Sequence, residues 1–133
     1  SRGLGDVYKR QIYGTLKSPV HAINLTDTLD QIYRVHDNPF VIAVDASLGT
    51  HNHIGYVTLS DTPLKPGLGV KKSLPEAGDV SITGIVNLSG IMEGMLLQST
   101  RLHTVMSLAD FISSGIFIAV HSCISSSITC ISR

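Results

Sequence analysis

The sequence predicts an α/β domain with a mostly parallel β-sheet. Two observations support this class: three short apolar runs rich in β-branched residues, and helical patterns before the first run and after the last. Strands that alternate with helices are typical of layered α/β domains whose strands run parallel. The chain has 133 residues and a mass of 14.2 kDa, which is the size of one domain.

An amphipathic helix is expected from about Asn24 to Asp37. Asn24 is a suitable N-cap, because its side-chain oxygen can accept a hydrogen bond from a backbone N–H of the first turn. The apolar residues of the segment recur at helical spacing and form one face: Leu25, Leu29 and Ile32. Asn38-Pro39 ends the helix, because proline disfavours helical backbone in the residue before it.

Three strands are expected in the middle of the chain. Residues 40–44 are continuously apolar, which suits a strand buried on both faces, and the run ends at Asp45. A small, polar loop over 46–53 leads to the second strand at 54–60, and the third lies at 80–86. The long loop between the second and third strands contains several Pro and Gly residues. Loops of that length in compact domains are usually functional or covered by partners.

Two helices are expected after the third strand, over Gly90–Ser99 and Arg101–Ala119. The second has an apolar face made of Leu102, Val105, Met106, Ala109, Ile112 and Ile116. From Val120 onward Ser and Ile dominate, and no helical or strand period is visible. We therefore treat residues 120–133 as a tail outside the domain.

The composition excludes several classes of protein. Lys+Arg is 10 and Asp+Glu is 10, and this balance argues against a generic binder of nucleic acid or anionic membranes. Charged residues make up 15% and apolar residues 43%, so the chain can bury a core. Cys123 and Cys130 are too few for a disulfide scaffold or a zinc finger. We find neither a signal-peptide pattern nor an apolar run of the ~18 residues that a membrane span needs, so we expect a cytoplasmic protein.

The first eleven residues do not resemble the rest of the chain. The hexamer Asp6–Gln11 looks like a translated sequencing-library adapter, a common artefact of assembled metagenomic reads. We therefore expect residues 1–11 to be an artefact, and a native gene to be interrupted just before Ile12. The alternative interpretation is a natural basic arm.

Asp45 is the residue most suggestive of chemistry. An acidic side chain at the carboxyl end of a buried strand lies where ligands bind in open α/β sheets, and partial burial there tunes it for acid–base work. Two close carboxylates can share one proton and activate a water, or they can hold a metal ion that does so. The other acids near expected strand ends are Asp61, Asp79 and Glu93. The alternative role for Asp45 is to cap the following loop.

Histidines and glycines offer weaker signals. His51-Asn52-His53 could join Asp45 in a site of two imidazoles and one carboxylate, although so short a pattern also fits an ordinary polar loop. His21 either lines the same end of the sheet or is a packed or surface imidazole. Gly67-Leu68-Gly69 lacks the third glycine and the strand–helix context of a nucleotide site. Neither a serine nor a cysteine hydrolase motif is found.

Several short motifs together resemble the YyaC-type spore protease family, a sporulation-linked group of spore-forming bacteria. The resemblance covers about residues 12–118 and is specific, because many motifs occur in the right order. The segments that carry it are Tyr13–Leu16, Pro19–Ala22, Asn38–Ala46, Pro63–Val70, Leu74–Asp79, Thr83–Asn87 and Gln98–Leu102.

A more distant similarity connects the chain with the germination protease of spores, which degrades small acid-soluble spore proteins. It is carried by Ile42–Ala46, Ser60–Thr62 and Pro66–Val70. That family is thought to use two aspartates. It shares its fold, a three-layer α/β/α sandwich, with the hydrogenase maturation endopeptidases. The resemblance therefore implies such a sandwich here, truncated at its N-terminus.

The resemblance also implies roles for particular residues. Asp45 matches the second of the family's two acidic residues, and the first belongs upstream of Tyr13, where the adapter-like stretch stands. The nickel-recognising maturation enzymes use a further His, but the chain has none at Asn87–Gly90, so we expect no cofactor. Gly67 and Gly69 have no side chain, which permits the backbone of their loop to approach the site closely. The expected site-lining residues are Asp61, His21, Gly67, Gly69 and Asn87.

These observations lead to one expected function and two alternatives. We expect a sporulation-associated peptidase-like hydrolase whose intact form acts on a peptide or protein through a two-carboxylate site, with Asp45 as one carboxylate. We expect no nucleic-acid or membrane partner. The first alternative is a non-catalytic sporulation protein that keeps the fold as a binding module. The second is a metal-dependent peptidase that uses Asp45 with His51 or His53.

Overall fold

A computed structural model describes residues 10–66, 74–88 and 95–131 of the chain. It divides into two compact units, one formed by Ser1–Phe40 and Lys65–Ala77 and the other by Val41–Leu64 and Gly78–Arg133. The elements, in chain order, are α1 (Leu25–Val35), β1 (Ile42–Gly49), the 3-10 helix η2 (His51–His53), β2 (Val57–Ser60), β3 (Val80–Leu88) and α2 (Met95–Ile131). The α/β class expected from the sequence is confirmed.

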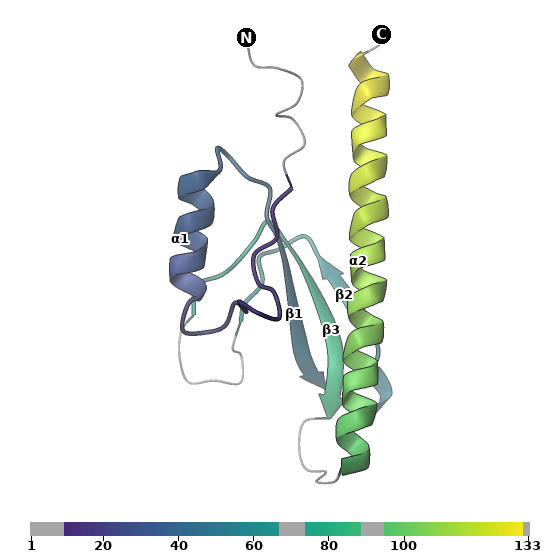
Figure 1. Ribbon diagram of the computed structural model, residues 1–133. Helices are drawn as coiled ribbons and strands as arrows, with labels where there is room; N and C mark the ends of the chain where they lie inside the picture. The colour runs from purple at the N-terminus through teal and green to yellow at the C-terminus, as the bar shows by residue number, and fades with distance from the viewer. Residues whose placement is uncertain (1–9, 67–73, 89–94, 132–133) are drawn as a thin grey trace. The chain divides into compact units, whose positions relative to one another are not determined.

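The second unit is built on a three-stranded mixed sheet with the order β1-β3-β2 (Figure 1). β1 runs parallel to β3, and β2 runs antiparallel to it. The expectation of a mostly parallel sheet is therefore wrong, since one of its two pairings is antiparallel. A register shift between Ser47 and Leu48 interrupts the parallel ladder.

β1 is longer than expected. The strand continues through Gly49, because its pairing with β3 extends to Leu88. The expected loop at 46–53 is therefore wrong in its first half, while its second half contains η2. The strand is half-buried to exposed along its length, so burial on both faces is also wrong.

β2 is shorter than expected, and β3 is slightly longer. Gly55 adopts a φ of 87°, a left-handed conformation that suits glycine in a turn, and β2 begins only at Val57. The N–H of Gly55 donates to the carbonyl of Ile85 at 2.8 Å, which attaches this turn to β3. β3 ends at Leu88, two residues beyond the expected end at residue 86.

α1 forms where the sequence predicts it, and its Ile32 is buried. Asn24 occupies the N-cap position but makes no side-chain capping bond to the helix. Its side chain instead accepts from the N–H of His21 at 2.8 Å and donates to the carbonyl of Pro19 at 3.0 Å. Asn24 therefore stabilises the turn that leads into α1.

α2 is one continuous helix, so the expectation of two helices is wrong for the described part, which begins at Met95. Between Ser99 and Arg101, where a break was expected, there is neither proline nor glycine to end a helix. The helix also continues through residues 120–131, so the prediction of a tail from Val120 onward is wrong for these residues. Its Leu108 is 7% exposed.

α2 lies alongside the sheet and contacts β3 (Figure 1). A Cβ built on Gly84 would lie 3.5 Å from Cδ1 of Leu108 and 3.7 Å from Cδ1 of Ile112. This contact shows which face of the sheet α2 covers.

The stretch Leu102–Cys123 in α2 is long and apolar enough to cross a membrane, by length and composition alone. The expectation that no stretch reaches this length is therefore wrong. A core helix of a soluble protein passes the same test, so the finding is compatible with a cytoplasmic location.

Candidate functional site

Asp45 lies in the middle of β1 rather than at its carboxyl end. It is the fourth of eight residues in the strand, and its side chain is exposed. Its Oδ1 accepts a hydrogen bond of 2.8 Å from the backbone N–H of Ala46. The partial burial expected from the sequence is therefore absent. An exposed carboxylate on a rigid strand is nevertheless accessible to a ligand.

Asp45 belongs to a row of polar residues that crosses the sheet. It pairs with Thr83 of β3, and Thr83 pairs with Thr58 of β2. Register partners place their side chains on the same face of a sheet. Gly84 meets α2, and side chains alternate along a strand, so this row occupies the face away from α2. The Thr58 hydroxyl also donates to the carbonyl of Thr83 at 3.5 Å.

A second polar row lies beside the first on the same face. Ser60 of β2 pairs with Ser81 of β3. The Ser81 hydroxyl is largely buried and donates to the carbonyl of Thr62 at 2.9 Å, while the hydroxyls of Ser60 and Thr62 are 2.8 Å apart. These bonds hold the residues after β2 against β3.

Asp61 is not a neighbour of Asp45. It follows Ser60 at the end of β2, and β2 and β1 lie on opposite sides of β3. Two strand spacings therefore separate the backbones of the two acids by at least about 10 Å. Two carboxylates that share one proton lie about 3 Å apart. Asp61 is exposed and does not complete a carboxylate pair with Asp45.

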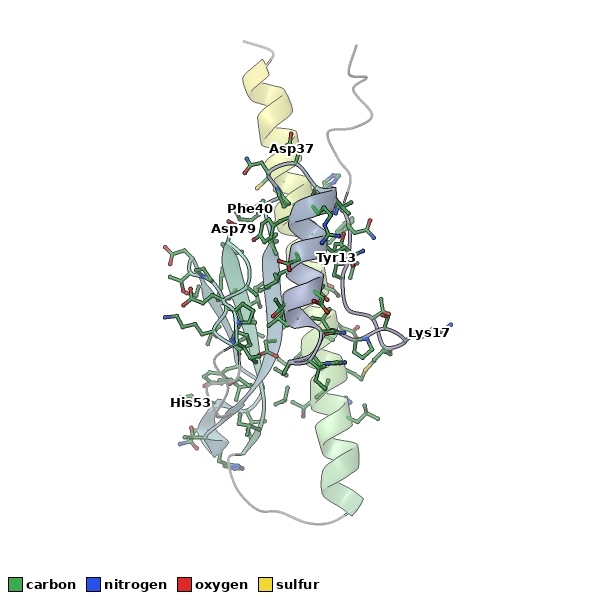
Figure 2. All side chains as sticks on the ribbon, turned by 90° about the vertical axis from the view of Figure 1, so that its left-hand side faces the viewer. Tyr13, Lys17, Asp37, Phe40, His53 and Asp79 are labelled. Carbon is green, nitrogen blue, oxygen red and sulfur yellow. The ribbon has the colours of Figure 1, made fainter. Side chains whose placement is uncertain are left out.

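Asp79 has a structural role. Its carboxylate Oδ2 accepts from the N–H of Val41 at 2.7 Å, and its own N–H donates to the carbonyl of Val41, also at 2.7 Å. This pair of bonds lies just before β1 and β3 begin (Figure 2 labels Asp79). It joins the starts of the two parallel strands.

His21 lies in the other compact unit, in the turn before α1. Its Nδ1 accepts from the N–H of Ile23 at 3.3 Å. In the same unit, the hydroxyl of Tyr13 and Nε2 of His36 are 3.0 Å apart, and Figure 2 shows Tyr13 beside α1. Both contacts stabilise the ends of the helix, which is an ordinary structural use of histidine.

His51 and His53 lie in η2 and are exposed. Nδ1 of His53 is 2.8 Å from the hydroxyl of Thr50, and its ring makes an edge contact with Tyr56 at 5.5 Å between centroids. Over residues 10–66, 74–88 and 95–131, no group of three His, Cys, Asp or Glu side chains is placed to hold a metal ion.

The remaining expected site residues are placed only in part. Gly67 and Gly69, and the acid Glu93, lie outside the described residues. Asn87 lies in β3, where its backbone is the register partner of Leu48. Among the described residues, the register places Thr83 beside Asp45 and Thr58 one strand further across the sheet, and neither was an expected site residue. Their signal is the alternation of polar and apolar residues in the second and third expected strands.

Comparisons with known proteins identify relatives but no activity. A family model described as "Protein of unknown function (DUF1256)" matches residues 5–115. "Uncharacterized protein YyaC" of Bacillus subtilis (strain 168) is 53% identical over 105 residues, which make up 79% of this chain and 51% of the relative. The chain thus spans about half the length of this curated relative. No solved structure matches significantly. The resemblance to YyaC-type proteins is confirmed.

Proposed function

The chain belongs to the DUF1256 family, and from this membership we propose that its full-length form is a sporulation-associated peptidase-like hydrolase. The proposed substrates are spore proteins. The proposed active site contains two carboxylates, of which Asp45 is one.

The observation that carries the proposal is the position of Asp45. Its carboxylate is exposed on the face of the sheet away from α2 and next to a row of hydroxyls. Pairing with β3 fixes the backbone on one side of Asp45, so the carboxylate stands on a rigid element. An exposed, rigidly held carboxylate can act as a general base.

The proposed reaction needs a second acid. The Asp45 carboxylate removes a proton from a water molecule, and the water oxygen attacks the carbonyl carbon of a peptide bond. The second acid protonates the amide nitrogen as the C–N bond breaks, which yields a carboxylic acid and an amine.

The second acid is assigned to the part of the full-length protein that this chain does not span. Asp61 is about two strand spacings away, and Asp79 is occupied by Val41. The three-layer α/β/α arrangement and the cytoplasmic location in the sporulating cell or spore are parts of the same proposal.

The proposal is tested with the full-length protein and a purified small acid-soluble spore protein as substrate. Mass spectrometry of the digest detects cleavage, and Asp45→Asn removes the proposed base while keeping the size of the side chain. Asp61→Asn is the matched control, because it changes an exposed acid in the same sheet. We expect Asp45→Asn to abolish cleavage and Asp61→Asn to preserve it.

A binding module is the second candidate function. It is favoured by one observation: among the described residues, neither Asp61 nor Asp79 forms a carboxylate pair with Asp45. In that case the full-length protein binds a spore protein without cleaving it. Binding measured by calorimetry, with intact substrate recovered afterwards, would select this function over the hydrolase.

A further inference from the structure

α2 is strongly apolar between Leu102 and Cys123, yet most of this stretch is exposed. Between Leu102 and Cys123 the only charged residue is Asp110, yet 11% of this stretch is buried. Phe111 is 69% exposed, Phe117 62% and Ile118 64%. Helices with this composition are normally buried.

Most polar residues between Leu102 and Cys123 gather in one narrow stripe, while Thr104, Ser113 and Ser122 lie outside it. Successive residues turn by about 100° around a helix, so five of them fall within a sector of about 60°, on the far side from Leu108. We call this sector the polar stripe, and its members are His103, Ser107, Asp110, Ser114 and His121.

Exposed apolar side chains flank the polar stripe on both sides. Phe111 and Ile118 lie on one side, and Met106 and Phe117 lie on the other. The sector around Leu108 and Ile112 meets the sheet at Gly84. Large apolar side chains on both sides of the polar stripe therefore remain exposed among the described residues.

We propose that the two flanks of α2 are covered by the part of the full-length protein that lies outside this chain, so that α2 is a central helix of a larger domain. The matched relative supports this occupant, because the aligned part makes up only 51% of its length. About half of that relative therefore lies outside the aligned part. This inference is independent of the proposed hydrolase activity.

Two other occupants fit the surface less well. In a bilayer, Asp110 would lie near the middle of the 22-residue stretch, where a carboxylate is costly. Leu108 and Ile112 also contact the sheet, which prevents lipid from surrounding this part of the helix. A second copy of the chain would require a flat, one-sided patch, whereas the apolar residues lie on opposite flanks.

Substitutions in the full-length protein test the proposal. Phe111→Asp and Phe117→Asp each place a charge on one flank, and Ser114→Asp places the same charge on the polar stripe between them. We expect each Phe substitution to lower the melting temperature by about 10 °C or to prevent folding, because a buried charge is strongly destabilising. Ser114→Asp should shift it by no more than about 2 °C. Equal, small shifts in all three variants would overturn the proposal.

Thiol labelling is a second measurement, and it needs only cysteine substitutions, which are milder than the substitutions to Asp. In a background with every native cysteine, Cys123 and Cys130 among them, replaced by Ser, Phe117→Cys and Ser114→Cys introduce single thiols. Under native conditions the thiol at position 117 should react at least about tenfold more slowly than the thiol at 114, because a covered side chain reacts only when the structure opens. Equal rates would show that the flank is exposed in the full-length protein.

The mass in solution and the binding to vesicles show whether a second copy of the chain or a membrane covers the flanks instead. We expect a full-length protein whose mass by light scattering is unaffected by the Phe117 substitution and which does not float with vesicles of phosphatidylcholine and phosphatidylglycerol. A dimer that Phe117→Asp dissociates would assign the flank to a second copy. Flotation that Phe117→Asp abolishes would assign it to a membrane. Either result would overturn the proposal.

Discussion

Asp79 and Val41 form a two-bond clasp at the start of the parallel strands. The Asp79 carboxylate accepts from the N–H of Val41 at 2.7 Å, and the Asp79 N–H donates to the carbonyl of Val41 at the same distance. The clasp fixes the register in which Ile42 faces Val80. That register in turn places Asp45 opposite Thr83, so an acid far from the candidate site helps to define it.

Asp79→Ala should destabilise the full-length protein by about 1 kcal/mol, because it removes a charge-assisted hydrogen bond while leaving an exposed N–H that water can satisfy. Asp79→Asn keeps an acceptor oxygen and should cost less. Urea unfolding measures both, with Asp61→Ala as the control for loss of an exposed acid. If Asp79→Ala lowered the free energy of unfolding no more than Asp61→Ala, the two bonds to Val41 would not stabilise the protein.

Gly78 allows the clasp to form. It adopts a φ of 85°, and a Cβ there would lie 3.0 Å from both the Cβ of Ala43 and the carbonyl oxygen of Val80. Gly78→Ala should therefore cost about 1–3 kcal/mol through backbone strain and crowding. Gly115→Ala is the matched control, because a Cβ at Gly115 meets nothing within 4 Å. In the helix this control should stabilise by up to about 1 kcal/mol. If thermal unfolding showed that both variants change the stability in the same direction, the proposed role of Gly78 would be contradicted.

The turn before α1 depends on Asn24. Asn24→Ala removes the bonds to His21 and Pro19 and should cost about 1 kcal/mol. Asn52→Ala, an exposed position in η2, is the control. Hydrogen exchange of the first turn of α1 is the sharper measurement, and we expect faster exchange in Asn24→Ala alone. Unchanged exchange would mean that the helix itself holds the turn.

The 133-residue chain by itself should be poorly soluble or partly unfolded. Among the described residues the buried apolar side chains are Ile32, Ala77 and Leu108, and so small a core supplies little of the free energy that folding requires. Calorimetry should show a broad transition or none. A sharp, cooperative transition in a monomeric sample would contradict this prediction.

The sequence predicted the elements better than their ends. The amphipathic pattern located α1 and the β-rich runs located all three strands, because these signals come from burial of alternating or periodic residues. The ends depend on pairing. β1 continues past Asp45 because β3 provides partners as far as Leu88. The residues of one strand do not indicate how long its neighbour is, so the end of β1 could not be predicted from its own sequence.

The candidate site was predicted less well for the same reason. Sequence reasoning chose Asp45 from the end of an apolar run, and the structure places it in mid-strand and exposed. Thr83 lies beside Asp45 and Thr58 lies one strand further. They are 38 and 13 residues away in the sequence, so only the register aligns them with Asp45. Asn24 shows a smaller version of this effect. Its position at the helix start was predicted, but its bonds lead to the preceding turn.

We propose that the Asp45 carboxylate activates the water that hydrolyses a peptide bond. The most direct measurement is the initial rate at which the full-length protein cleaves a small acid-soluble spore protein, compared with Asp45→Asn at equal concentration and equal thermal stability. We expect a rate loss of at least about 100-fold, the typical minimum contribution of a general base. Cleavage at an unchanged rate would contradict it.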